Sequence, residues 1–316
     1  MPCWLWYNPG RGTCSVTTEE THQPPVRAGL GADAEPDDRS ADLSDEVRRL
    51  RLELDSIRRQ FMGWPIERMI EGYVPDAVLA EHMARYRFAA GHLHGAVMDV
   101  ACGSGFGAAY LADQPQIDYV VAADVDRDVV AYAASRYRRP RALFIRQDAC
   151  APWAVDQLDG IASFETIEHV SSPDLFLEQA ARALKPDGCF VVSTPVRRRG
   201  QLADPPDWPF HLREWSASEF VSLLAQYFDD VALYTQCLSL RQDFGPIHIG
   251  RRLARRMARL SGTSDEQLHA LEFDVVDPHS TKGFWLKPNP RYTVCLCRRP
   301  HAPRDPATIR ALAYGR

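Results

Sequence analysis

The sequence predicts an α/β protein built on a doubly wound, seven-stranded, mostly parallel sheet, with a helix before it and an insertion near its C-terminal end. Between positions 96 and 236, short apolar runs rich in β-branched residues alternate with helical segments, as a parallel sheet covered by helices requires. The stretch VMDVACGSGFG (97–107) adds a buried strand, a glycine-rich turn and the start of a helix. Sheets of this kind bind nucleotides at such a corner.

The composition indicates a globular protein and excludes several classes of function. Of the 316 residues, 45% are hydrophobic and 25% are charged, and a net charge of −5 argues against a dedicated nucleic-acid binder, which needs a basic face. A solvated helix face explains the basic cluster RRLARR (251–256) equally well. Eight cysteines without a C-x-x-C pair argue against zinc and for a reducing cytoplasm. No run of about 18 apolar residues and no signal peptide is found, so we expect a cytoplasmic protein that does not enter a membrane.

The region before the sheet divides into a tail and a helix. Residues 1–42 are rich in Pro, Gly, Thr and Asp, show no periodicity and are expected to be disordered. A helix then follows over 43–62, with Ser44 as its N-cap. Its apolar residues have the 4-3 spacing of a coiled-coil seam: Leu43, Val47, Leu50, Leu54, Ile57 and Phe61. Two interpretations stay open, because the helix could lie on its own domain or form a homodimer with a second copy.

Each element of the sheet region follows from a local pattern. A helix over 76–90 ends at Gly91, with Leu79, Met83, Tyr86 and Ala90 as its expected buried stripe. The expected strands are the apolar runs at 96–100, 118–126, 141–150, 160–164, 189–196, 228–236 and 291–299. The intervening helices are expected at about 105–112, 127–137, 174–184 and 216–226, the last capped by Ser216, and a turn is expected at 185–188. The insertion 237–290 precedes the last strand, and a tail without structure is expected from residue 300.

The glycine pattern alone is ambiguous. Gly103, Gly105 and Ala108 satisfy the dinucleotide pattern G-x-G-x-x-G/A, so an oxidoreductase that binds NAD is one interpretation. Asp99 argues against it, since a carboxylate inside the strand offers nothing to a pyrophosphate but favours a ligand with an ammonium group. The run from Asp99 to Gly105 has the Asp-x-x-x-Gly-x-Gly form and resembles the first motif of class I S-adenosylmethionine (SAM) methyltransferases. The glycines, Gly107 included, are expected to leave bare backbone against the ligand.

This resemblance covers residues 66–236 and 291–299, and it implies a Rossmann-like methyltransferase domain over 66–299 whose seventh strand inserts antiparallel between the fifth and sixth. It also implies a SAM site at the carboxyl ends of the strands. Asp99 would hold the methionine end, Asp124 the two ribose hydroxyls, and Asp148, with the Ala149 backbone, the adenine amino group. Glu165 would face the sulfonium, and Arg85 or Tyr86 would reach the methionine carboxylate. The remaining expected cofactor residues are Ala101, Gly103, Gly105 and Val125.

The flanking motifs resemble a narrower bacterial group of small-molecule methyltransferases, similar to the ubiquinone type, that accompany sugar and natural-product biosynthesis. They are SFETIEHV (163–170), LKPDGCFVVSTP (184–195) and PFHLREWSASEF (209–220). A hydroxyl acceptor must lose a proton, and Glu168, His169 and His211 are the candidate bases. A packing role for either histidine is the alternative. Trp208, Phe210 and Trp215 form either an acceptor wall or the packing of a loop.

The sequence therefore predicts a SAM-dependent O-methyltransferase that acts on a small molecule, with a sugar hydroxyl or a glycosylated natural product favoured. An N-methyltransferase acting on an amine is the first alternative. A SAM-binding protein without transferase activity, acting as a partner through the helix at 43–61, is the second. Neither a metal nor a covalent enzyme intermediate is expected, because SAM is already an activated donor. The motif Asn/Asp-Pro-Pro-Tyr/Phe is absent after the fourth strand, which disfavours methylation of nucleic-acid bases.

Overall fold

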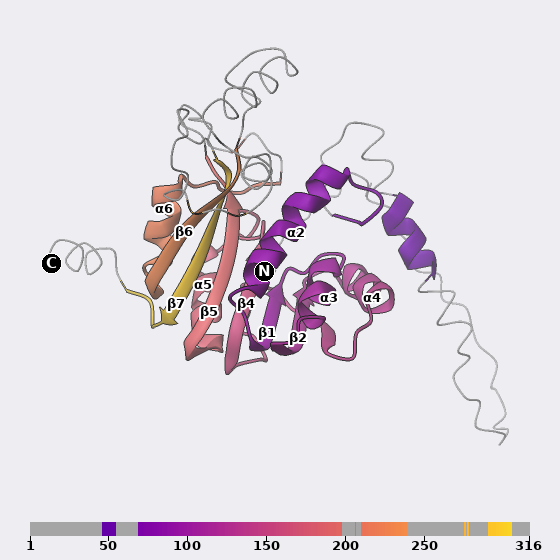
Figure 1. Ribbon diagram of the computed structural model, residues 1–316, viewed down its shortest axis with the longest axis horizontal. Coiled ribbons are helices and arrows are strands. Elements are labelled where there is room, and N and C mark those ends of the chain that lie inside the picture. The colour runs from indigo at the N-terminus through magenta and orange to yellow at the C-terminus, as the bar shows by residue number, and fades with distance from the viewer. Residues whose placement is uncertain are drawn as a thin grey trace, which may run out of the picture.

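The computed structural model describes residues 46–54, 69–197, 206, 210–238, 275, 277 and 290–304. Its core is one seven-stranded sheet in the order β3-β2-β1-β4-β5-β7-β6 (Figure 1). The strands are β1 (Gly95–Val100), β2 (Ile117–Asp124), β3 (Ala142–Arg146), β4 (Leu158–Phe164), β5 (Leu184–Pro195), β6 (Phe228–Leu238) and β7 (Pro290–Pro300). The first five strands pair in parallel, and β7 is antiparallel to both β5 and β6. The predicted fold class and the inserted seventh strand are confirmed.

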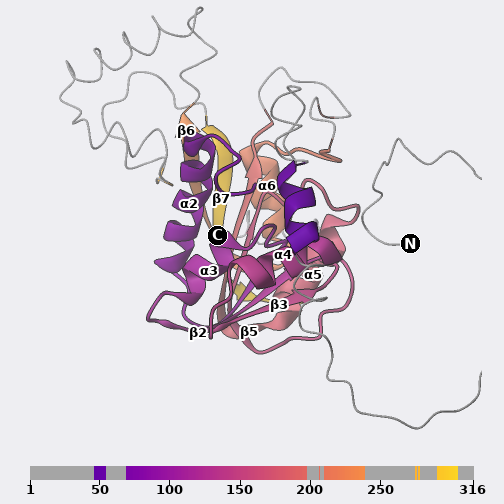
Figure 2. The same ribbon diagram turned by 90° about the vertical axis from the view of Figure 1, so that its right-hand side faces the viewer.

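Helices cover both faces of this sheet (Figures 1 and 2). They are α2 (Asp76–Ala90), α3 (Phe106–Ala112), α4 (Arg127–Arg136), α5 (Pro173–Ala183) and α6 (Ala217–Leu224). The buried apolar residues of α2 and α3 share one core cluster with the sheet, and those of α5 and α6 share the other. The sheet therefore lies between two helical layers, as the alternating apolar pattern predicts.

The alternation of side chains along β1 decides which residues face which layer. Met98 and Val100 belong to the cluster beneath α5 and α6, whereas Val97 belongs to the cluster beneath α2 and α3. Successive side chains of a strand point to opposite faces, so Asp99 shares the face of Val97. The strand thus delivers a carboxyl group beneath α2, almost fully buried at 1% exposure.

Helix α2 has the predicted bounds but a different buried face. Leu79 and Met83, expected in the buried stripe, are half-buried, while Arg85 is completely buried and Glu81 nearly so. Tyr86 and Ala90 are buried as predicted. The helix is rotated relative to an apolar stripe because it brings polar side chains onto the sheet, and buried polar side chains need partners there.

Two segments depart from their predicted structure for local reasons. Strand β3 ends at Arg146, short of the predicted residue 150, because the Asp148 carboxylate accepts the Cys150 backbone N–H at 2.9 Å and turns the chain. The predicted turn at 185–188 lies instead within β5, where the register to β4 shifts between the pairs Leu158–Leu184 and Gly160–Cys189. The residues of β5 between Leu184 and Cys189 form a bulge-like irregularity in the strand.

Residues 46–54 form the described part of the N-terminal helix, and it lies on its own domain. The Arg48 guanidinium pairs with Asp128 of α4 at 3.0 Å, and the Tyr73 hydroxyl donates to Glu53 at 2.8 Å. The described seam residues Val47, Leu50 and Leu54 nevertheless stay 45–50% exposed. The helix therefore contacts its domain through one face while the seam faces outward.

Several predicted features lie outside the described residues: the tail 1–42, the seam residues Leu43, Ile57 and Phe61, Trp208, the basic cluster 251–256, and nearly all of the insertion 237–290. The first part of the tail from residue 300 is held in place, since Arg304 pairs with Asp229 at 2.6 Å. Among the described helices, none has the length and hydrophobicity that crossing a membrane requires.

Candidate active site

The turn after β1 carries three glycines, and each lacks a side chain for a different reason. Gly103 has φ +55°, and a Cβ built there would meet nothing within 4 Å, so this position leaves open space beside the backbone. At Gly105, with φ +94°, a Cβ would lie 2.7 Å from the Ala133 Cβ of α4. At Gly107 a Cβ would lie 1.9 Å from Cζ of Tyr86. At Gly105 and Gly107 the missing Cβ makes room for packing, and the expectation that their backbone faces a ligand stays a prediction.

Tyr86 fills the space beside Gly107 and holds Asp99. Its ring packs edge-to-face against Phe164 with centroids 4.9 Å apart, and its hydroxyl donates to the Asp99 carboxylate at 3.1 Å. Burial raises the pKa of Asp99 to about 7, although the Tyr86 hydrogen bond opposes this shift. A buried carboxyl group with that pKa gains from a cationic ligand, because the cation favours its charged form.

Asp124 ends β2 with both carboxylate oxygens held by backbone. Oδ2 accepts the Gly103 N–H at 3.1 Å, and Oδ1 accepts the Asp126 N–H at 3.0 Å. The carboxylate thus ties the glycine turn of β1 to the end of β2. Each carboxylate oxygen has a second lone pair, so a vicinal diol could bond both oxygens at once.

The residues after β2 and β3 surround the next part of this edge. Asp148 folds back on the Cys150 N–H, and the Ala149 carbonyl accepts the indole N–H of Trp153 at 3.1 Å. The Val125 carbonyl accepts a bond from Arg146 at 3.0 Å. Because these backbone carbonyls serve the protein itself, the Ala149 N–H and the Asp148 carboxylate are the groups suited to a purine edge.

Two non-glycine residues at this edge of the sheet have left-handed backbone conformations. Ala101 follows β1 with φ +60°, and Glu165 follows β4 with φ +53°. Such conformations cost about 1–3 kcal/mol and occur preferentially at binding sites. The Glu165 carboxylate accepts the Ser193 hydroxyl at 2.7 Å, and burial raises its pKa. The backbone strain gives a sign of the site that no sequence pattern contains.

Arg85 is directed away from Tyr86, towards β6 and β7, and lies at the edge where the parallel strands have their carboxyl ends. Its Nη1 donates to Gln236 of β6 at 2.6 Å, and its guanidinium carbon lies 4.6 Å from the ring centroid of Tyr292 on β7. Its Nε and Nη2 have no hydrogen-bond partner among the described residues, although the side chain is completely buried. Buried N–H donors without a partner are costly, so these two nitrogens suit an anionic group of a ligand, even though Glu165 and Glu168 interact with the guanidinium charge.

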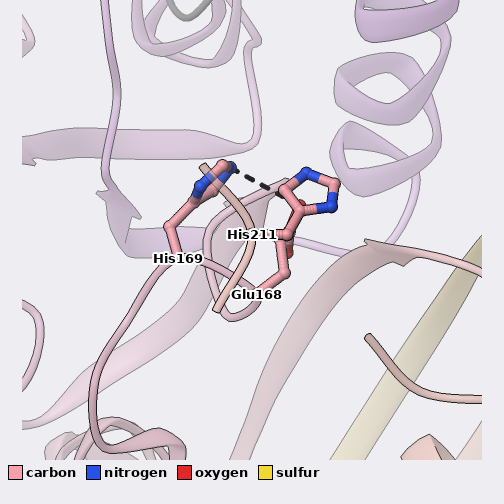
Figure 3. A group of neighbouring side chains, drawn as sticks. All are labelled: Glu168, His169 and His211. Carbon is pink, nitrogen blue, oxygen red and sulfur yellow. Dashed lines mark ion pairs between the residues drawn. The ribbon is translucent and has the colours of Figure 1, made fainter. Parts of the chain in front are cut away.

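A second cluster of side chains follows β4: Glu168, His169 and His211 (Figure 3). The two imidazole rings meet edge-to-face with centroids 4.9 Å apart, and His169 Nε2 lies 3.9 Å from Glu168 Oε1. The loop that carries His211 is fastened to this turn, because the Leu212 N–H donates to the Glu168 backbone carbonyl at 2.8 Å. The structure thereby brings together His169 and His211, two candidate bases that are 42 positions apart in the sequence.

The protonation of this cluster differs from the expectation of an ordinary histidine. Burial lowers the pKa of His169 to about 4, so its ring is neutral near pH 7 and is a weaker base than predicted. Burial and the neighbouring Glu165 raise the pKa of Glu168 well above its usual range. His211 donates from Nδ1 to the Glu214 carboxylate at 2.6 Å, a partner that the sequence analysis missed although its i, i+3 spacing within PFHLREW could have indicated it.

The two described aromatic residues near His211, Phe210 and Trp215, have different surroundings. Trp215 is 6% exposed, belongs to the core cluster beneath α6 and packs on Phe220 at 5.8 Å between centroids. Of the two interpretations, packing is therefore the one that the surroundings of Trp215 favour. Phe210 is half-buried and contributes its backbone carbonyl to His169 Nδ1 at 2.8 Å.

Comparisons with known proteins agree with this geometry. Residues 98–192 match the family model described as a methyltransferase domain. A protein of Mycobacterium tuberculosis named probable S-adenosylmethionine-dependent methyltransferase is 36% identical over 139 residues, which cover 43% of this chain and 50% of that protein. A Mycolicibacterium smegmatis protein of similar name is 36% identical over 131 residues, or 40% of this chain and 49% of that protein. The chain thus spans about half the length of these curated relatives.

Among solved structures, a chain of the Haloferax volcanii complex that holds the Trm112 methyltransferase activator has 18% identity and a TM-score of 0.49, covering 73% of this chain and 94% of that chain. The sheet order, the glycine turn and the match of residues 98–192 to a methyltransferase domain are together similar to those of class I SAM-dependent methyltransferases. The cofactor of this class is SAM.

The described residues fit that cofactor. Asp124 presents two fixed oxygens to a diol, Asp99 is a buried carboxyl group that a cation would favour, and Gly103 leaves open space between them.

Proposed function

We propose that this chain is a SAM-dependent O-methyltransferase that acts on a hydroxyl group of a small molecule, with a sugar or a glycosylated natural product as the favoured acceptor. The observation that carries the hydroxyl assignment is the cluster of Glu168, His169 and His211 directly after β4. A hydroxyl must lose its proton during methyl transfer, whereas a neutral amine can attack without a base. A group of two partly buried imidazoles and one buried carboxyl suits the first reaction.

The cofactor supplies a methyl group on a positively charged sulfur, which is an activated donor. In this proposal Asp124 holds the ribose diol, Asp99 the ammonium group, and Asp148 with the Ala149 N–H the adenine edge. Tyr86 positions Asp99 through its 3.1 Å hydrogen bond instead of touching the cofactor carboxylate. Arg85, with two unpartnered nitrogens, is the group that would bind that carboxylate.

The chain's own residues then place the acceptor. Glu165 lies next to the cofactor edge and Glu168 three residues further, so the hydroxyl would lie between the methyl donor and the histidine cluster. Alignment of the two reactants accounts for most of the expected rate enhancement, since it turns an encounter in solution into a reaction within one complex. His211 is the candidate base in this proposal, because the Glu214 carboxylate at Nδ1 orients the ring and fixes the tautomer that accepts a proton at Nε2.

A lipid acceptor is the second candidate. A fatty-acid O-methyltransferase of Mycolicibacterium smegmatis is 30% identical over 113 residues, covering 35% of this chain and 40% of that protein. This similarity supports a carboxyl or hydroxyl of a lipid as an alternative oxygen acceptor. The insertion 237–290, which could select the acceptor, lies outside the described residues.

The test is methyl transfer from SAM with an isotopically labelled methyl group, measured on the full chain. The acceptors tested in parallel would be a free sugar, the matching amino sugar and a fatty acid. One molecule of S-adenosylhomocysteine (SAH) should form for each molecule of labelled product. The proposal expects label on an oxygen, and His211→Ala should lower the rate while SAH affinity is retained. Label on the amino sugar nitrogen alone would establish the N-methyltransferase instead. SAH binding without transfer to any acceptor class, including extracts of small metabolites, would favour the non-catalytic alternative.

A further inference from the structure

We propose that Glu168, His169 and His211 form a binding site for a first-row divalent transition-metal ion, which binds and activates the acceptor hydroxyl. This inference rests on the proposed function and specifies how its proton is removed. Each of the three residues offers one ligand atom, and these atoms lie within 4.8 Å of one another (Figure 3). Two imidazoles and one carboxylate with positions left open for substrate are a ligand set of catalytic metal sites.

The Glu168 carboxyl group gives the first argument. The side chain is completely buried, and its Oε2 accepts the Thr194 hydroxyl at 3.1 Å. Its Oε1 has no hydrogen-bond partner among the described residues and is directed towards His169 Nε2 at 3.9 Å. A buried carboxyl oxygen without a partner costs free energy, and a bound cation would supply the missing interaction.

The orientation of the two histidines gives the second argument. His169 places Nδ1 2.8 Å from the Phe210 carbonyl, which only accepts, so Nδ1 carries the hydrogen and Nε2 is the basic nitrogen. His211 likewise has Nδ1 bonded to Glu214, which fixes the same tautomer. Metal-binding histidines characteristically donate their second ring N–H to a carbonyl or a carboxylate, which fixes the ring and strengthens the ligand. Both rings already have this arrangement.

The size of the cluster is compatible with an ion after a small adjustment. Ligands about 2.0–2.2 Å from Zn²⁺ lie roughly 3–3.5 Å from one another. The present separations of up to 4.8 Å therefore require the side chains to turn inward by about 1 Å, which side-chain rotations can supply. The backbone is fixed on both sides, because Leu212 N–H and Arg213 N–H both donate to the Glu168 carbonyl.

The chemistry balances without an oxidant or reductant. The acceptor hydroxyl binds the ion, its O–H bond breaks, and the proton leaves to solvent, since a metal ion lowers the pKa of a bound hydroxyl. The resulting alkoxide oxygen forms a bond to the methyl carbon while the carbon–sulfur bond breaks, and its electron pair stays on sulfur. The products are the methyl ether, SAH and one proton. In this account the histidines bind the ion and neither acts directly as the base.

The proposed site has no cysteine ligand, so it differs from the cysteine-bound zinc site that the absence of a C-x-x-C pair argues against. The described cysteines Cys102, Cys150, Cys189, Cys295 and Cys297 are all buried and none belongs to this cluster. Methyl transfer as such needs no metal, which is why none is expected from the sequence; the ligand set arises because the loop at 210–215 is bonded to the turn after β4.

The experiment is a titration of the chelator-treated full chain with Co²⁺, followed by visible absorption and by calorimetry. One equivalent should bind and produce the absorption of a nitrogen- and oxygen-ligated ion. Glu168→Gln and His211→Ala should each weaken binding at least tenfold, by analogy with the loss of metal-site residues. His94→Ala is the matched control, because His94 is exposed and lies before β1, and it should leave binding unchanged.

SAH titration of the same preparations separates the two proposals and tests whether each variant is folded. SAH binding without Co²⁺ binding would overturn the metal site and leave the proposed function, with the His211–Glu214 pair as the direct base. Co²⁺ binding that neither variant weakens would also overturn it, since the ion would then be elsewhere. Failure of SAH to bind the wild-type chain would instead reject the proposed function. Hydroxyl methylation should also stop on chelation and return with added ion.

Discussion

Replacement of Asp124 by alanine tests the cofactor site at the residue with the best-defined geometry. Its two oxygens each accept one backbone N–H, from Gly103 and from Asp126, and the proposal gives each a ribose hydroxyl as well. Hydrogen bonds to a charged group are worth about 1.5–3 kcal/mol each, of which water recovers a part. We expect Asp124→Ala to weaken SAH binding by about 1–3 kcal/mol, a factor of roughly 5 to 150.

The same substitution removes a support of the fold, so the assay must distinguish the two effects. Loss of both backbone bonds should lower the free energy of unfolding by about 1–3 kcal/mol, and calorimetry should be done well below the midpoint of thermal unfolding. Asp124→Asn keeps one acceptor oxygen and should give an intermediate affinity. Asp118→Ala is the matched control, because Asp118 is an exposed carboxylate at the other end of β2. Unchanged SAH affinity in folded Asp124→Ala protein would refute the ribose assignment.

Four further predictions concern the pH response of binding and of stability, the packing of the glycine turn and the N-terminal helix. Asp99 has a pKa of about 7 in the free protein, and an ammonium ligand favours its charged form. SAH affinity should therefore rise about tenfold between pH 6 and 8. An equal rise in folded Asp99→Asn protein would contradict this. The same raised pKa means that Asp99 destabilises the fold as pH rises from about 4 to 7, so Asp99→Asn should flatten the dependence of the unfolding free energy on pH in that range. Gly107→Ala should lower the unfolding free energy by about 1–3 kcal/mol, because the new Cβ clashes with Tyr86. In thermal melts this loss should disappear in a Tyr86→Ala background. A loss that persists there would disprove the clash. If the exposed seam pairs with a second copy, Leu50→Lys should reduce the mass measured by light scattering from dimer to monomer, whereas an unchanged mass would exclude the seam as the interface.

Much of the fold could be predicted because it depends on local patterns. The strands and helices follow from apolar periodicity, Ser216 forms the predicted cap with Glu219 in a capping box, and α2 has the predicted bounds. The positions of Asp99, Asp124 and Asp148 at one edge follow from the parallel order of β1, β2 and β3, because the carboxyl ends of parallel strands meet there.

The rest depends on contacts between distant residues and could not be read from spacing. Arg85 and Tyr86 are neighbours in sequence, yet one contacts β6 and β7 and the other contacts β1, since adjacent side chains on a helix point about 100° apart. The low pKa of His169 is a consequence of burial, which no motif specifies. Gly107 is needed because the Tyr86 ring of α2 packs against it, and the spacing of the two residues does not indicate this contact.

The measurement that tests the central claim most directly is a calorimetric titration of the full chain with SAH, with NAD titrated under the same conditions. A SAM-dependent methyltransferase should bind SAH with micromolar affinity and give no heat with NAD. Binding of NAD alone would contradict the account, because the turn after β1 would then hold a pyrophosphate and Asp99 would have no ammonium group to bind.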